Sequence, residues 1–261
     1  GYSVSAVYLG LALGPFIAGL MIESFSWRFA FLLHVPLALI VLYIGFFHVK
    51  PEWRTDEFGT FDVFGAILYA VGITCLMLAI ATDKNFGSML LVVVALIVLY
   101  AFVRNEEAHS FPIFDVRSFY SNRVFSMSCL ASLLMYTATF STVVLVSLYL
   151  QYLKGVSPSR AGLLLMIQPT TMALLSPVAG RLSDKIEPRI LASFGMIITA
   201  SGLAILASVD SRSEITLVAV ALASIGLGFS LFSSPNANAI MGSVAGNDYG
   251  RAASAMSVMR V

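Results

Sequence analysis

Eight stretches of this chain contain no Asp, Glu, Lys or Arg for about twenty residues or more, and short polar segments separate them. The stretches are Gly1–Ile22, Phe29–Val49, Val63–Thr82, Asn85–Val103, Val124–Leu153, Ala161–Gly180, Ile190–Val209 and Ile215–Asn247. A helix needs ~20 mostly apolar residues to cross a bilayer. Backbone polar groups find no water in lipid, so each stretch must pair them within a helix. The pattern predicts an all-α polytopic membrane protein with eight spans, whose first partner is the lipid bilayer.

Two stretches, Val124–Leu153 and Ile215–Asn247, are longer than one crossing requires. Two crossings and a turn would need ~40 residues, so we expect each stretch to be one helix that tilts or extends into the interface. Pro235 lies inside the second stretch, and its missing N–H is expected to interrupt the helix ladder there. We expect the amides of Asn236 and Asn238 to satisfy the backbone groups that this frees.

Composition narrows the class further. The chain is 59% hydrophobic and 11% charged, whereas soluble domains are ~25% charged. The net charge is +1 and no long basic block occurs, which argues against nucleic acid as a partner. Cys75 and Cys129 fall in apolar stretches, which favours small core residues over a disulfide or a metal site. The chain starts without Met and stops within an apolar segment, so we expect a fragment that lacks material at both ends.

The basic residues of the loops predict the orientation. Loops on one side contain nine of them: Lys50, Arg54, Arg104, Arg117, Arg123, Arg181, Lys185, Arg189 and Arg251. Loops on the other side contain five: Arg28, Lys84, Lys154, Arg160 and Arg212. The positive-inside rule places the first set in the cytoplasm. We therefore expect a multi-pass protein of the cell membrane (inner or plasma membrane) whose first helix runs outward.

The acids are informative by their positions. None of the fourteen Asp and Glu residues lies at a predicted bilayer midplane. Because intramembrane carboxylates are the usual proton carriers of transporters, we expect any proton-coupling acid in sequence outside this chain. No HExxH motif, Ser/His/Asp set or metal-spaced Cys/His set occurs, and His34, His48 and His109 are scattered. We expect neither an enzyme nor a metal or other cofactor.

Glycine and proline mark the first stretch. Gly10 and Gly14 are spaced i, i+4, so they share one helix face and would let a neighbouring helix approach closely. Pro15 removes a ladder bond and is expected to kink the helix. Ordinary helix packing is the alternative, because pairs of small residues at this spacing occur in many membrane helices.

The order G-xxx-GP-xx-xG, formed by Gly10, Gly14, Pro15 and Gly19, resembles the antiporter motif in the fifth helix of proton-coupled exporters of the major facilitator superfamily. Further segments resemble that family in order along the chain. They are Ser26–Phe29 with His34–Pro36, Phe61–Gly65, Phe111–Phe119, Tyr149–Gln151 with Ala161–Gly162, Gly180–Arg189, and Gly226–Gly228 with Ser234–Asn236. Together they resemble the fourteen-span drug:proton antiporters of the EmrB/QacA type, of which the chain would cover roughly helices five to thirteen.

The resemblance implies a helical bundle that is present in part. The expected parts are residues 1–49, the end of an N-terminal bundle (two spans); 50–104, two extra linker spans; 105–123, a cytoplasmic connector; and 124–261, a C-terminal bundle of four spans plus the start of a fifth. The chain departs from the family at Ala18, where glycine is usual, and at His34, where asparagine is usual. For His34 we favour a hydrogen-bonded packing role over a proton relay.

The resemblance also implies two functional regions. Gly10, Gly14, Pro15 and Gly19 would seal the outer ends of two helices against each other. The loop with Gly180, Arg181, Asp184, Lys185 and Arg189 would act as a latch that holds the cytoplasmic gate shut.

Local chemistry gives the latch loop a physical basis. We expect Asp184 at the start of the following helix, where the helix dipole and a nearby arginine would stabilise its carboxylate. A topology signal is the alternative role, because Arg181, Lys185 and Arg189 would orient the protein in any case.

Substrate contacts are sought among the polar and aromatic residues of the spans. The candidates are Tyr136, Phe140, Gln151, Gln168, Asn236 and Asn238. Pockets for apolar ligands combine aromatic walls with few polar anchors. Interhelical packing and hydrogen bonding is the competing role for each of these residues.

Three function classes follow from these observations. The first is a secondary transporter that exports hydrophobic or cationic drugs in exchange for protons by alternating access. The second is a carrier of the same fold for a specific lipid or metabolite, with different coupling. The third is a membrane scaffold that transports nothing. The family also includes members that pair with a periplasmic adaptor protein, so such a partner is a further expectation of the resemblance.

Overall fold

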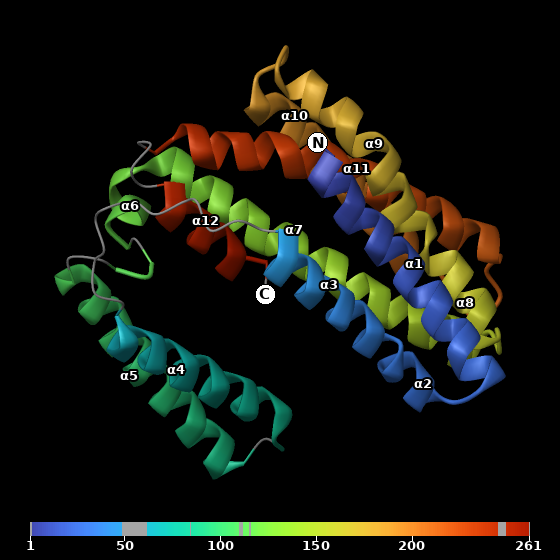
Figure 1. Cartoon of the computed structure of the whole chain (residues 1–261), viewed down its shortest axis with the longest axis horizontal. Coiled ribbons are helices and arrows are strands. Elements are labelled where there is room, and N and C mark those ends of the chain that lie inside the picture. Colours follow the sequence, from blue (N-terminus) through green and yellow to red (C-terminus); the bar gives the residue numbers. More distant parts are fainter. Residues whose placement is uncertain are drawn as a thin grey trace. The chain divides into compact units, whose positions relative to one another are not determined.

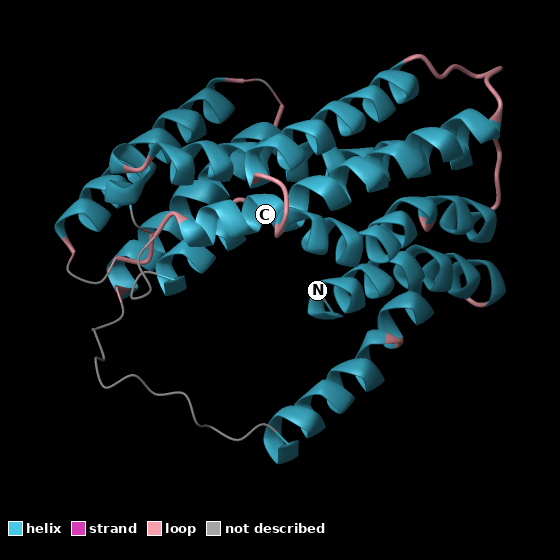
Figure 2. Ribbon diagram, turned by 90° about the horizontal axis from the view of Figure 1, so that it is seen from above, coloured by secondary structure: helices cyan, strands magenta, loops and turns pink. Residues whose placement is uncertain are grey.

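The computed structural model describes residues 2–48, 62–83, 85–109, 112–114, 116–244 and 249–260. These residues form helices and turns, with no strand among them (Figures 1 and 2). The elements are α1 (Tyr2–Ser24), α2 (Trp27–Leu32), α3 (His34–His48), α4 (Val63–Ala81), α5 (Phe86–Ala108), α6 (Val116–Ser121), α7 (Arg123–Leu148), the π-helix η1 (Tyr149–Leu153), α8 (Pro158–Leu165), α9 (Ile167–Ser183), α10 (Pro188–Ala207), α11 (Ile215–Gly242) and α12 (Tyr249–Val258). Several residues used above lie outside the described ranges: Lys50, Arg54, Phe61, Lys84, Phe111 and Asp115.

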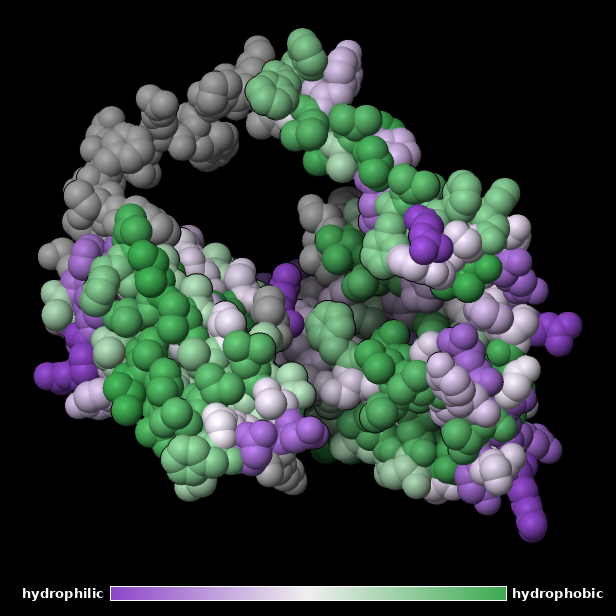
Figure 3. All heavy atoms as spheres, turned by 90° about the horizontal axis from the view of Figure 1, so that it is seen from below, coloured by the Kyte–Doolittle hydropathy of each residue, from purple (hydrophilic) through white to green (hydrophobic). Residues whose placement is uncertain are grey.

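The eight expected spans are confirmed in the described residues. Eight helical segments are long and apolar enough to cross a membrane, from Ala6–Ser24 to Ile215–Gly242. Large apolar side chains lie on their outer surfaces, as the green areas of Figure 3 show. On α3, for example, Phe46 and Phe47 are 82% and 74% exposed. Such surfaces are stable against lipid rather than water, so the chain is a multi-pass membrane protein with an all-α fold.

The chain divides into two compact units. One contains Gly1–Glu52 and Ala131–Ala239, and the other contains Trp53–Leu130 and Ile240–Val261. In the first unit, α1 lies along α8 and α9 (Figure 1). The division into bundles, linker spans and connector that the sequence suggests stays a prediction.

Proline explains where two expected spans are divided. The ladder stops at Leu33, between α2 and α3, and at Met166, between α8 and α9. Pro36 and Pro169 have no N–H for the carbonyls four residues before them, at Leu32 and Leu165. The stretches Phe29–Val49 and Ala161–Gly180 are therefore each two helices, a feature that the charge pattern did not reveal.

Other prolines leave their helices whole. Pro15 lies inside α1 and Pro235 inside α11, and both helices continue past them. The expected interruption at Pro235 is therefore wrong. The expected role of the amides is also different, because Asn236 Nδ2 donates to Ser132 Oγ at 2.8 Å and Asn238 Nδ2 donates to Ser183 Oγ at 3.1 Å. These amides join α11 to α7 and α9.

His34 begins α3, and its Nδ1 lies 2.9 Å from the carbonyl oxygen of Ala30. The expected hydrogen bond is present, whereas the expected packing is not, because His34 is exposed in the described structure. The interaction stays within the α2–α3 segment.

The buried core of the first unit contains two clusters. One includes Tyr8, Met135, Met172, Ala173, Ala192, Phe229 and Phe232. The other includes Val146, Leu150, Ala161, Leu165, Val218 and Leu222. In the second unit, Phe125 and Cys129 pack with Ile240, Ala252 and Ala255. The expectation that Cys129 is a small core residue agrees with its complete burial.

Glycine brings α10 and α11 into direct backbone contact. A Cβ on Gly195 would stand 2.5 Å from the carbonyl oxygen of Gly228. A Cβ on Gly228 would stand 2.5 Å from the Gly195 oxygen and would also meet Thr199. Neither position has room for a side chain, so this seam depends on glycine.

We predict that Gly228→Ala destabilises the full-length protein, because the added methyl group must push α10 and α11 apart. Overpacking of this kind costs about 1–3 kcal/mol. Gly45→Ala is the matched control, since nothing lies within 4 Å of its added Cβ on α3. Thermal unfolding in detergent should show a lower midpoint for Gly228→Ala alone. Equal midpoints for the two variants would contradict the seam.

Candidate functional site

A cavity of about 340 Å³ lies within the first unit. Residues of α1, α7, α8, α9 and α11 surround it. Most of its lining is apolar, and Leu165, Pro169 and Met172 form the side given by α8 and α9. Small-molecule sites are typically cavities of roughly 300–1,000 Å³ with apolar walls and few polar groups, so this cavity is the candidate functional site.

Aromatic rings form much of the wall. Tyr136 of α7 packs edge-to-face on Phe229 of α11, with ring centroids 5.2 Å apart, and lies nearly parallel to Phe140 at 6.2 Å. Tyr8 of α1 meets Phe229 edge-on at 6.2 Å and its hydroxyl donates to Ser233 Oγ at 3.2 Å. Rings held in this way offer flat faces and edges to an apolar ligand.

Two buried polar atoms of the lining have no hydrogen-bond partner in the described structure, Gln168 Oε1 and Thr139 Oγ1. The contrast with nearby threonines is clear, because Thr137 and Thr142 each donate to the carbonyl four residues before them at 2.8 Å. An unpaired buried polar group costs ~1–3 kcal/mol. These two atoms are therefore where a ligand that hydrogen-bonds would gain most.

The backbone explains the position of Gln168. It lies in the first turn of α9, directly after the interruption at Met166 and before Pro169. Gly226 of α11 packs on this turn, and a Cβ there would stand 2.5 Å from the Gln168 carbonyl oxygen. The proline and the glycine together fix the turn that carries the amide.

The glycines of α1 do not act as expected. Gly10 and Gly14 line the cavity, and no atom lies within 4 Å of a Cβ added to either one. The expectation that they form the close contact is wrong for the described structure. The contact between α1 and α8 lies at Gly19, whose added Cβ would stand 2.6 Å from the Pro158 oxygen, and at Gly162, which faces the Pro15 oxygen at 2.5 Å. Spacing identified the helix but not the face that meets α8.

The other substrate candidates lie elsewhere. Tyr136, Phe140 and Gln168 are brought together at the cavity, as described above. Gln151 is exposed in η1, and its Nε2 bonds to Ser147 Oγ at 2.9 Å. Asn236 and Asn238 take part in interhelical bonds. The alternative role, packing and hydrogen bonding, therefore fits these three residues better.

The loop after α9 also differs from expectation. Asp184 is the C-cap of α9, and Glu187 is the residue that precedes α10. The expected place of Asp184 at the start of the next helix is therefore wrong. Arg189 pairs with Glu187 at 3.3 Å, and no ion pair joins Asp184 to a basic residue in the part of the chain described. Gly180 and Lys185 lie in the same turn region, with Gly180 inside α9.

The opposite end of the unit is tied by hydrogen bonds between loops. Lys154 Nζ donates to the carbonyl oxygens of Ser211 and Ser213 at 2.7 and 2.5 Å, and Tyr149 donates to that of Asp210 at 2.7 Å. The segment Pro158–Ser183 between Lys154 and Asp184 has 26 residues, which is ~39 Å of helix. The two loops are therefore a membrane thickness apart, as alternating spans require.

Asp210 is ionised within this loop. The Ser213 hydroxyl and the N–H groups of Arg212 and Ser213 donate to its carboxylate and lower the pKa of Asp210. A lowered pKa stabilises the turn at neutral pH, and that contribution disappears as the pH falls through the lowered value.

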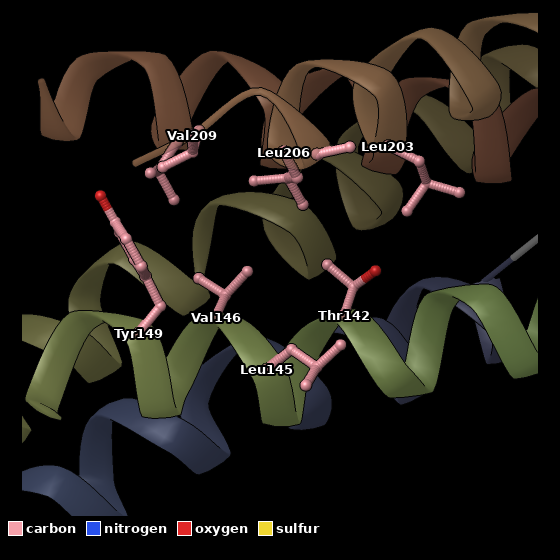
Figure 4. Close-up of a pocket in the computed structure, with 9 residues that line it drawn as sticks. Thr142, Leu145, Val146, Tyr149, Leu203, Leu206 and Val209 are labelled. Atoms are coloured by element: carbon pink, nitrogen blue, oxygen red, sulfur yellow. The ribbon is translucent and has the colours of Figure 1, made fainter. Parts of the chain in front are cut away.

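A second cavity, of about 300 Å³, serves as a comparison. Figure 4 shows Thr142, Val146 and Tyr149 of α7 facing Leu203 and Leu206 of α10. Its polar groups are satisfied, because Thr142 bonds to its own helix and Tyr149 bonds to Asp210. This groove is apolar without an anchor, which favours the first cavity as the ligand site.

The sequence argument missed several lining residues, notably Tyr8, Thr139, Met172 and Phe229. Tyr8 and Phe229 look like ordinary apolar positions in charge-free stretches. Thr139 is one of several hydroxyl residues in α7, and only its unpaired oxygen distinguishes it. Pro169 was the available signal, because a proline inside a span marks the turn that carries Gln168.

Comparison with known proteins places this geometry in context. The sequence profile of the Major Facilitator Superfamily matches residues 1–260. The chain is 30% identical to the riboflavin transporter RibZ of Clostridioides difficile, over 100% of this chain and 57% of that protein. It is 26% identical to the multidrug resistance protein Stp of Mycobacterium tuberculosis, over 97% and 47%, and 31% identical to the multidrug export protein EmrB of Haemophilus influenzae, over 72% and 38%. The chain spans about half the length of these curated relatives.

We predict that Gly14→Leu fills part of the cavity and weakens binding of an apolar fluorescent dye, while thermal stability changes little. Gly19→Leu is the matched control, because its side chain meets the Pro158 backbone and should lower stability. Dye titration and unfolding of the same two purified variants separate the effects. A stability loss in Gly14→Leu as large as in Gly19→Leu would restore Gly14 to the helix contact.

Proposed function

Because the chain belongs to the Major Facilitator Superfamily, we propose that it is part of a secondary transporter that exports hydrophobic or cationic aromatic compounds in exchange for protons. The family and its relatives indicate a transporter rather than an enzyme. The observation that carries the substrate class is the aromatic cavity with its two unpaired polar atoms.

The cavity supports a mode of substrate binding. The rings of Tyr136, Phe140 and Phe229 would hold a flat apolar body, whose contacts tolerate different shapes. Gln168 and Thr139 would accept or donate one hydrogen bond each. Few anchors and large aromatic surfaces suit a broad range of substrates, which is the property that an exporter of drugs needs.

The packing supports alternating access. The close contact of α1 with α8 lies at Gly19 and Gly162, toward the end of the unit that carries Lys154, which the charge pattern assigns to the outside. In the proposed cycle this contact closes the outer path and opens when the helices rock apart. Asp184, in the loop at the other end, would form latch contacts in the alternate state.

Proton exchange, drug resistance, a location in the plasma membrane and a periplasmic adaptor belong to the same proposal. The multidrug names of Stp and EmrB support export. The coupling acid would lie in helices that precede this chain, since the fourteen acids here avoid the predicted midplane.

A second candidate has its own support. RibZ, a relative along the whole chain, is a riboflavin transporter. A flavin is flat, aromatic and rich in hydrogen-bonding groups, so the same rings and the same amide could hold it. This candidate is a carrier of a specific metabolite with its own coupling.

Transport by the full-length protein in proteoliposomes distinguishes the candidates. For a drug:proton antiporter we expect a pH gradient to drive uptake of ethidium into inside-out vesicles, and the movement to stop when nigericin removes the gradient. Riboflavin should not compete. Transport of riboflavin without ethidium would establish the second candidate, and movement of neither compound class would contradict both.

We also predict that Gln168→Leu reduces the apparent affinity for a hydrogen-bonding substrate about tenfold, since a lost bond of ~1.4 kcal/mol corresponds to that factor. Gln151→Leu is the matched control, because Gln151 is an exposed glutamine that bonds locally to Ser147. Concentration dependence of transport should change for the first variant alone. An unchanged affinity in Gln168→Leu would remove the amide from the substrate site.

A further inference from the structure

Two acids are buried at one end of the α4–α5 hairpin, within the second unit. Asp62 precedes α4 and is 4% exposed, and Glu106 lies in the last turn of α5 and is 2% exposed. Asp62 caps α4, since its Oδ1 accepts the Gly65 N–H at 2.8 Å. That bond gives the Asp62–Gly65 pattern in the sequence a structural role, but it leaves Glu106 unexplained.

The second carboxylate holds the chain that follows. Glu106 Oε2 accepts the backbone N–H of Phe114 at 2.8 Å, which fastens the segment 112–114 to the end of α5. Glu106 Oε1 is buried and has no partner in the described structure. An orphaned oxygen on a residue that is 98% buried requires an explanation, because burying an unsatisfied or charged group is costly.

The orphaned oxygen points toward Asp62. Asp62 Oδ2 and Glu106 Oε1 both lie within 2.7 Å of the point where a Cβ on Gly65 would stand. They are therefore no more than about 5.4 Å apart, and only glycine leaves this space to them. Asn105 Nδ2 donates to Asp62 Oδ2, so one neutral group also faces the pair.

Few other charges act on this pair. Asp62, at the start of α4, and His109, after α5, are the charged or titratable groups whose fields reach Glu106 among the described residues. The exposed Arg104 pairs with Glu107 at 3.1 Å instead. Two buried carboxylates this close cannot both ionise easily, because like charges repel strongly away from water.

We propose that Asp62 and Glu106 form a proton-binding site that holds one proton between them and thereby clamps the segment 112–114 to the α4–α5 hairpin. Neutral Glu106 donates its Oε1–H toward Asp62 Oδ2, while its Oε2 accepts the Phe114 N–H. When the proton leaves to water, two carboxylates remain and repel each other, and the clamp opens. The site is separate from the cavity and does not depend on the proposed substrate or on proton-coupled export.

Hydrogen–deuterium exchange of the full-length protein in nanodiscs tests the clamp. After correction for the intrinsic pH dependence of exchange, protection of the Phe114 amide should fall about tenfold or more between about pH 5 and about pH 9. Glu106→Gln keeps an acceptor for Phe114 and a donor for Asp62, so its protection should change less than about twofold over that range. Glu107→Gln, at the adjacent exposed acid, is the control and should behave as the parent protein.

Three further outcomes make the test decisive. Asp62→Asn keeps the helix cap and removes one charge, so protection should become nearly independent of pH. Infrared spectra should contain a protonated carboxyl band that Glu106→Gln loses and Glu107→Gln keeps. A parent protein with pH-independent protection, a Glu106→Gln variant with the parent's pH dependence, or protection that follows Na⁺ at constant pH would each overturn the proposal.

Discussion

Every feature of this chain depends on one constraint, which is that backbone N–H and C=O groups cannot be left unpaired in lipid. The constraint turns each apolar stretch into a helix and leaves proline as the residue that interrupts it locally. Pro36 and Pro169 divide their spans, whereas Pro15 and Pro235 do not. The division at Pro169 coincides with the cavity, because the same turn presents Gln168 to it. Irregular backbone is thus tolerated where protein, and not lipid, surrounds it.

Much of the fold was predictable because charge-free length is a nearly sufficient signal for a membrane helix. All eight spans were found, and their ends moved by a few residues where helices continue into polar sequence, as α5 does through Glu106. The face of each helix was not predictable. Membrane helices have apolar residues on all sides, so spacing places Gly10 and Gly14 together without telling whether a helix or a cavity lies opposite them.

The site was predictable only in part for a related reason. A polar residue in a span can bind substrate or another helix, and sequence gives the same letter for both roles. Gln151 and Gln168 illustrate this, because one amide is satisfied by Ser147 and the other has an unpaired oxygen in an aromatic cavity. Asn236 and Asn238 are likewise satisfied by serines. The partner of a polar atom, which only the folded chain reveals, decides between structure and function.

The same criterion connects two distant parts of the molecule. In the cavity, unpaired neutral atoms stand among rings, so a neutral or weakly charged donor can satisfy them without a large desolvation cost. At the end of the α4–α5 hairpin, the unpaired atom belongs to a carboxylate beside another carboxylate, and only a positive species satisfies it. A proton is the smallest such species and needs no coordination shell, which suits a space bounded by Gly65. The chemistry of the unpaired atom therefore determines the class of ligand, aromatic in one place and a proton in the other.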